Sequence, residues 1–95
     1  MNLKDLHNDS TSVQTTMLFP AADGKVISLQ ITKGAQLKEH TTKVPALLIC
    51  VTGNAVYQDE KGIQAPLFSG DFVKIEPNVK HWVDAIDQSN LLLIK

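Results

Sequence analysis

Hydrophobic and polar residues alternate along much of this chain with the period of two that is typical of β-strands. The clearest case runs from Lys25 to Thr32, where Ile27, Leu29 and Ile31 fall on one face and the residues between them on the other. Such a segment is predicted to be a strand with one buried face and one exposed face.

A second kind of segment is the continuous apolar run ALLICV at positions 46–51, which Pro45 and Gly53 bound. It is short for a helix, and its length and flanking residues favour a strand that is covered on both faces.

Further short strands are predicted between turn signals rich in Gly, Pro, Asn and Asp, and no amphipathic helix longer than two turns is indicated. These strands are expected at 13–19, 37–42, 54–58, 63–67, 72–76, 81–86 and 91–95. About nine short strands favour an all-β fold, an antiparallel sandwich or barrel. Residues 1–12 are mostly polar and are predicted to form an N-terminal arm, which leaves residues 13–95 as a single domain.

Composition limits the partners of this domain. All nine positive charges are lysines and the net charge is -1, so the chain lacks the arginine that usually binds phosphate or guanine in a bidentate manner, and nucleic-acid binding is not expected. A domain of 95 residues gains stability by pairing, and a homodimer formed through segment 13–19 is expected.

The distribution of apolar residues predicts a cytoplasmic protein with no membrane contact. No apolar stretch approaches the roughly 20 residues that cross a bilayer, and the first ten residues lack the apolar segment of a signal peptide. The single Cys50 has no internal disulfide partner, which fits a reducing compartment.

Two spacings point to a family. Five residues separate Gly34 from His40, with Gly53 following at the distance expected for the same motif, and positions 70–81 read GDFVKIEPNVKH. These spacings resemble the two motifs of the cupin superfamily, G(X)5HXH(X)3,4E(X)6G and GDxxxIPPGxxH. The resemblance implies an antiparallel jelly-roll β-barrel whose interior holds the functional site.

The chain departs from the family pattern where metal ligands are expected. Thr42 stands at the second histidine position and Ala46 at the glutamate position, while Glu76 and Asn78 replace the usual proline and glycine. The resemblance leaves His40 and His81 as metal ligands, which is two fewer than the family uses. Any divalent metal (Zn, Ni, Mn or Fe) is therefore expected to bind weakly, and no cofactor is expected.

Alternation places the other residues of the predicted pocket. If His40 and His81 point inward, as the resemblance implies, then Thr42 and Val83 do so too. An inward Ala46 likewise implies that Leu48 and Cys50, at alternate positions of the same strand, point inward. Trp82 is then expected on the outer face. The predicted ligand pocket consists of His40, Thr42, Ala46, Leu48, Cys50, His81 and Val83. For Cys50, a small buried apolar role is favoured over a metal ligand or an activated thiol.

Three functions remain open. The favoured one is a non-catalytic barrel that binds a small organic molecule in its interior, with the metal site eroded. The alternative is a metal-dependent enzyme, similar to the dioxygenases and isomerases of the family, in which His40 and His81 hold the metal. A metal-free enzyme with a histidine base is also considered, although no carboxylate is predicted to orient either ring.

Overall fold

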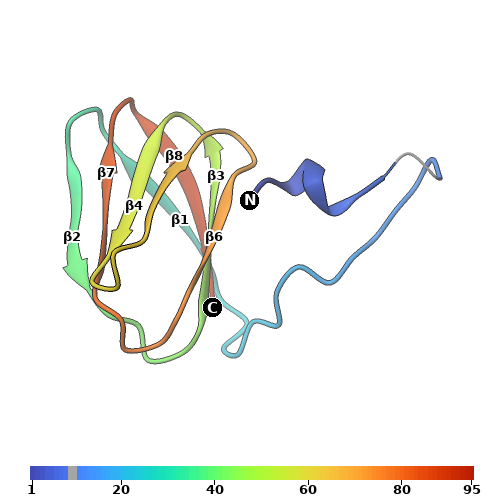
Figure 1. The fold of residues 1–95 in the computed structure, drawn as a ribbon, viewed down its shortest axis with the longest axis horizontal. Helices are drawn as coiled ribbons and strands as arrows, with labels where there is room; N and C mark the ends of the chain where they lie inside the picture. Colours follow the sequence, from blue (N-terminus) through green and yellow to red (C-terminus); the bar gives the residue numbers. More distant parts are fainter. Residues whose placement is uncertain (9–10) are drawn as a thin grey trace.

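The protein consists of two four-stranded antiparallel sheets that face each other, as seen in a computed structural model that describes residues 1–8 and 11–95 (Figure 1). The elements are η1 (Leu3–Leu6), β1 (Val26–Ile31), β2 (Gln36–His40), β3 (Ala46–Thr52), β4 (Ala55–Asp59), β5 (Gln64–Leu67), β6 (Phe72–Ile75), β7 (His81–Ala85) and β8 (Ser89–Ile94). Within the described residues, no helix has the length and apolar composition that crossing a membrane requires.

The strand order confirms the predicted jelly-roll architecture. One sheet has the order β1-β8-β3-β6 and the other β2-β7-β4-β5, so the chain passes repeatedly from one sheet to the other. Every pairing is antiparallel. Eight of the expected strands form, at close to their predicted positions.

The interior is packed with the inward faces that alternation predicts. Leu48 and Cys50 of β3 meet Tyr57 of β4 and Val83 of β7 in one core cluster between the sheets. The apolar run of β3 is covered on both faces as expected, because its alternate residues Leu47 and Ile49 belong to a second cluster on the outer face.

The chain between the predicted arm and β1 supplies the cover for that outer cluster. Leu18 and Phe19 pack against Leu47, Ile49 and Phe72. Nearer the start of the chain, the Phe72 N–H donates to the Met1 carbonyl over 2.9 Å and the Asn2 side chain donates to the Asp71 carboxylate over 2.9 Å. The chain before β1 is therefore fastened at residues 1–2 and again at 18–19 to the sheet that contains β6.

Between these anchor points the arm loops away from the barrel (Figure 1), and the strand expected over 13–19 does not form. Residues 12–24 make no backbone–backbone hydrogen bond with any described residue. The segment is strand-like in sequence, but no strand of the described residues lies beside it to complete the ladder. Positions 9 and 10 of the predicted arm lie outside the described residues, and the division at residue 12 stays a prediction.

We propose that this segment pairs with a second copy of the chain. Val13 and Met17 lie four residues apart and so on the same face of an extended strand, and each is 81% exposed. Pairing would remove this apolar surface from water, which is favourable. We expect light scattering at micromolar concentration to give twice the chain mass, and Val13→Asp with Met17→Asp to give the monomer mass.

A matched control is Ile86→Asp, since Ile86 is also exposed, at 51%, but lies in the turn after β7. This variant should remain dimeric. A monomer mass for the unmodified protein would reject the proposal.

Candidate functional site

His40 and His81 face each other across two neighbouring strands. They are register partners in the pairing of β2 with β7, and their ring centroids lie 4.2 Å apart with the planes tilted by 58°. The two imidazoles of the predicted site therefore lie close together, with His81 buried and His40 half-buried.

An irregularity in β2 brings His40 to this position. Leu37 pairs with Val83 and His40 with His81, and the register shifts between them. Because of the shift, Leu37 and His40 lie opposite Val83 and His81, which are on the same face of β7. In a regular strand, two residues three positions apart would lie on opposite faces. Glu39 is left on the exposed side, where it lies 3.8 Å from the Lys80 ammonium.

Both rings are held by backbone carbonyls. The Nδ1 atom of His40 lies 2.8 Å from the Lys38 oxygen, and that of His81 lies 3.1 Å from the Val79 oxygen. A carbonyl oxygen only accepts, so each Nδ1 carries the proton, and each neutral ring then presents Nε2 as an acceptor. The site thus offers two neighbouring acceptor nitrogens.

Asp59 extends this pair into a row across three strands. It is the register partner of His81 in the pairing of β4 with β7, it is 7% exposed, and the Tyr57 ring stacks at 5.8 Å from the ring of His81. The predicted strands 54–58 and 63–67 leave Asp59 in the turn between them, and no pattern in the sequence associates it with the histidines. The missing signal was the β4–β7 register, which no local pattern encodes.

The Asp59 carboxylate is fully engaged by its own hairpin. Oδ1 accepts from the backbone N–H groups of Lys61 and Ile63 over 2.9 and 3.1 Å, and Oδ2 accepts from the Tyr57 hydroxyl over 3.0 Å. Burial raises the pKa of Tyr57 well above its usual value, and the hydrogen bond to Asp59 and the negative charges of Asp59 and Glu76 raise it further. Asp59 therefore shapes the site without hydrogen-bonding either imidazole.

The other residues of the predicted pocket lie in packed surroundings. Ala46, Leu48, Cys50 and Val83 are all members of the core cluster between the sheets. Burial, with a contribution from Asp71, raises the pKa of the Cys50 thiol, which keeps it protonated and unreactive. Thr42 is buried, and its hydroxyl donates to the Val44 oxygen over 2.8 Å. Trp82 alternates with the buried His81 and Val83, as expected for the outer face.

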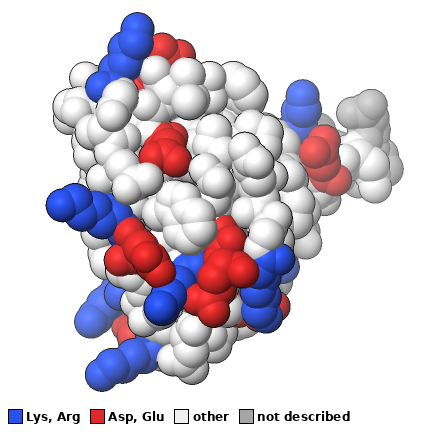
Figure 2. Space-filling model, turned by 60° about the vertical axis from the view of Figure 1, so that its left-hand side comes forward, with Lys and Arg blue, Asp and Glu red and all other residues white. Residues whose placement is uncertain are grey.

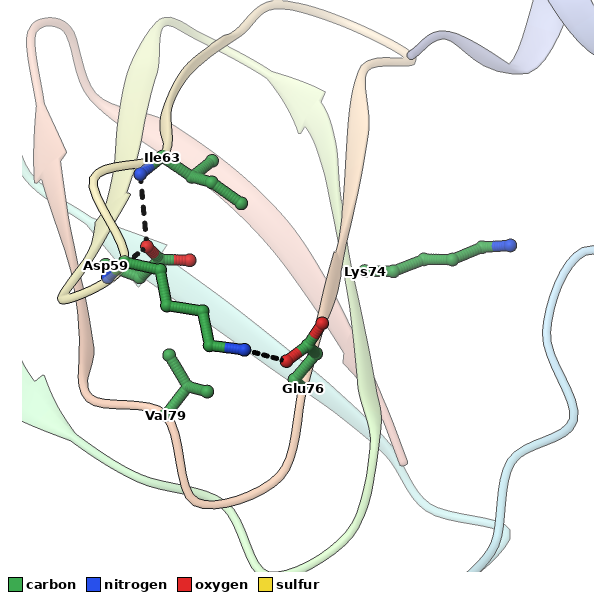
Figure 3. A pocket seen from close by; sticks show the side chains of 6 residues that line it. Asp59, Ile63, Lys74, Glu76 and Val79 are labelled. Carbon is green, nitrogen blue, oxygen red and sulfur yellow. Dashed lines mark hydrogen bonds and ion pairs between the residues drawn. The ribbon is translucent and has the colours of Figure 1, made fainter.

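An open hollow lies at the end of the interior, between the β4–β5 turn and the segment that follows β6 (Figure 3). Its lining consists of Asp59, Lys61, Ile63, Lys74, Glu76 and Val79. Charged side chains gather over the lower half of the face seen in Figure 2, whereas the upper half is mostly uncharged. Asp59 joins the hollow to the histidine row, since it belongs to both.

The donor set does not fit a tightly held resident metal. Two imidazole nitrogens are present, but the Thr42 hydroxyl donates elsewhere, Ala46 has no donor atom and the Asp59 oxygens are engaged. Among the described residues, no group of three His, Cys, Asp or Glu side chains is placed to hold an ion. Metal sites of the zinc or iron type usually take three or four protein ligands.

Burial lowers the pKa of His81, an effect that the neighbouring His40 reinforces and that the Val79 carbonyl and Asp59 oppose. The unfolded chain then binds more protons than the folded one near the usual histidine pKa of about 6.5. We expect the contribution of His81 to the free energy of unfolding, measured by urea titration with a chelator present, to be highest above that pH. It should fall as the pH drops from about 6.5 towards the lower folded pKa.

His81→Gln should flatten this dependence just below the usual histidine pKa of about 6.5, whereas His7→Gln, in the exposed arm, should leave it unchanged. An equal slope in the unmodified protein and in His81→Gln would contradict the assignment.

Comparison with known proteins gives likenesses of fold. No family model matches the chain, and no curated protein matches it in sequence. A cupin superfamily protein from Desulfitobacterium hafniense is similar over 100% of this chain and 87% of its own, with a TM-score of 0.71 and 16% identity. The cupin domain of CENP-C from Drosophila melanogaster is similar over 73% of this chain and 58% of its own, with a TM-score of 0.67 and 18% identity.

The oxalate decarboxylase of Bacillus subtilis, whose description names Mn(II) centres, is similar over 73% of this chain but only 20% of its own length, with a TM-score of 0.67 and 20% identity. Cupin neighbours of this chain thus include a metal-containing enzyme. At these identities the likeness concerns the fold. The two facing antiparallel sheets and these matches together show that the chain has the fold of the cupin superfamily.

Proposed function

We propose that this chain binds a small organic molecule at the open end of its barrel and does not transform it. The observation that carries the proposal is the hollow lined by Asp59, Lys61, Glu76 and Val79, which lies beside the histidine row. Small-molecule sites are concave, combine apolar walls with a few placed polar groups, and are usually preformed.

The histidine row favours binding over turnover. Both rings are fixed through Nδ1, and the one buried carboxylate nearby already accepts three hydrogen bonds. A general base needs a partner that orients it and stabilises its protonated form, and burial instead lowers the pKa of His81. The arrangement supplies acceptors for a ligand's hydroxyl or amine groups.

The test is an NMR-detected screen of small polar molecules against the ¹⁵N-labelled protein. We expect ligands to shift the amide signals of residues 59–63 and 76–81, and Val79→Trp, which fills the hollow, to abolish those shifts. Hits that shift only the outer face of β7 and β4, or hits that are unaffected by Val79→Trp, would reject this location.

A second candidate is the metal-dependent enzyme with His40 and His81 as ligands. One observation favours it: both rings donate Nδ1–H to a carbonyl, which is the arrangement that orients metal-binding histidines. We propose that zinc, nickel, manganese and ferrous iron bind weakly, because two imidazoles form only part of a ligand shell.

The favoured proposal of small-molecule binding includes a location in the reducing cytoplasm, which suits the buried free thiol of Cys50.

Calorimetric titration of each metal decides between the two candidates. We expect no stoichiometric binding at micromolar protein, and the same weak heats in His81→Ala. His7→Ala serves as the matched control because His7 lies in the exposed arm. Tight one-to-one binding that is lost in His81→Ala and kept in His7→Ala would move the enzyme to first place.

A further inference from the structure

An ion pair spans the hollow and joins the two sheets. Lys61 lies in the β4–β5 turn of one sheet and Glu76 directly follows β6 of the other. The Lys61 Nζ and the Glu76 Oε2 lie 2.5 Å apart, and the dashed line to Glu76 in Figure 3 shows the contact crossing from one sheet to the other. The two charges satisfy each other directly at the entrance to the hollow.

The other charged groups of the lining are not free to meet a ligand. The Asp59 carboxylate accepts three hydrogen bonds within its hairpin, and Lys74 extends away from the hollow (Figure 3). The remaining walls are Ile63 and the buried Val79, which are apolar. The hollow therefore presents one ammonium group, one carboxylate and an apolar wall.

The ion pair can open at small cost. The side chains of Lys61 and Glu76 are 55% and 67% exposed, and exposed pairs of this kind are weak because water competes for both charges. A ligand with one charge would pair with one member and leave the other without its partner. A ligand with both charges would replace both halves of the pair at once, so complementarity favours a zwitterion.

We propose that the hollow binds a small free α-amino acid, with its carboxylate at Lys61 and its ammonium group at Glu76. This proposal rests on the proposed binding function. The part of the hollow that the centre of a water molecule can occupy has a volume of about 40 Å³. A single water needs on the order of 10–15 Å³ of such volume. Room for about three waters suits glycine or alanine, with the alanine methyl against Ile63 and Val79.

The experiment titrates glycine into the ¹⁵N-labelled protein, with acetate and methylammonium as single-charge probes. Glycine should shift the amide signals of Lys61, Ile63 and Val79 saturably, and should bind about tenfold more tightly than either probe. Lys61→Gln and Glu76→Gln should each weaken glycine binding by about tenfold.

Two variants serve as controls. The exchange of Lys61→Glu with Glu76→Lys retains the ion pair and should retain glycine binding with the ligand reversed. Glu39→Gln with Lys80→Gln neutralises the other ion pair, whose Nζ to Oε1 distance is 3.8 Å, and should leave binding unchanged.

Equal affinity for acetate and glycine, or a glycine affinity that Glu76→Gln leaves unchanged, would overturn the zwitterion assignment. If other molecules shift the same amides while glycine does not, the assignment fails and the proposed binding function stands. If no molecule shifts them, both fail.

Discussion

Gly53→Ala is expected to destabilise the protein by about 3 kcal/mol or more. A Cβ at this position would lie 2.5 Å from the Gln88 carbonyl oxygen and 2.5 Å from the Ser89 hydroxyl oxygen, which is shorter than any real carbon contact. The backbone also has φ +109°, a region that side chains rarely adopt. Because a domain of this size is stable by only about 5–15 kcal/mol, thermal unfolding should show a fall in Tm of more than about 12 °C.

Gly34→Ala provides the matched control. Its φ of +79° is also positive, but no heavy atom lies within 4 Å of the position that a Cβ would occupy. This variant should lose only the conformational term of about 1 kcal/mol. If both variants lost the same stability, the close approach of β8 to Gly53 would not be the cause.

Asp59→Ala is expected to have the second largest effect, a loss of about 3 kcal/mol. The change removes the acceptor of two backbone N–H groups in the β4–β5 turn and leaves the buried Tyr57 hydroxyl without a partner. Unpaired buried donors carry their full desolvation cost of about 1–3 kcal/mol each. Urea unfolding measures the loss directly.

The hydroxyl's share can be separated by a double-mutant cycle. Tyr57→Phe alone should cost about 1 kcal/mol, and in the Asp59→Ala background it should cost nothing or be stabilising, since the unsatisfied donor is then absent. Fully additive losses would show that the Tyr57–Asp59 hydrogen bond contributes no coupling.

The sequence predicts most of the strands because their two faces differ in polarity. Alternation identified the inward residues of β3 and β7, but in β1 only Leu29 and Ile31 are covered and Ile27 is 39% exposed. The motif spacing brought His40 and His81 together although the chain between them forms four strands. These features are local patterns or fixed spacings in the sequence, so they can be predicted without knowing which strands lie next to one another.

Two features that depended on the neighbours were missed, and a third, the pocket, stays a prediction. Asp59 joins the histidine row only through the register of β4 with β7. Segment 13–19 has a strand pattern but no hydrogen-bonding partner among the described residues. The predicted pocket placed Ala46, Leu48, Cys50 and Val83 around a ligand, whereas these side chains pack together in the core. Whether a ligand ever reaches them stays a prediction, because alternation gives the face of a side chain and not the space in front of it.

The position of β8 has a consequence for how the chain is made. This strand, the last of the eight, lies between β1 and β3 and pairs with both, with Val26 opposite Ile94 at one end. Until residues 89–94 have left the ribosome, β1 has no neighbour in its sheet and the inner flank of β3 stays open. Completion of the barrel must therefore follow synthesis of the domain, and such distant pairings fold slowly, on the order of milliseconds to seconds. During that interval the exposed apolar edge of β3 is the part of the nascent chain that a chaperone would protect.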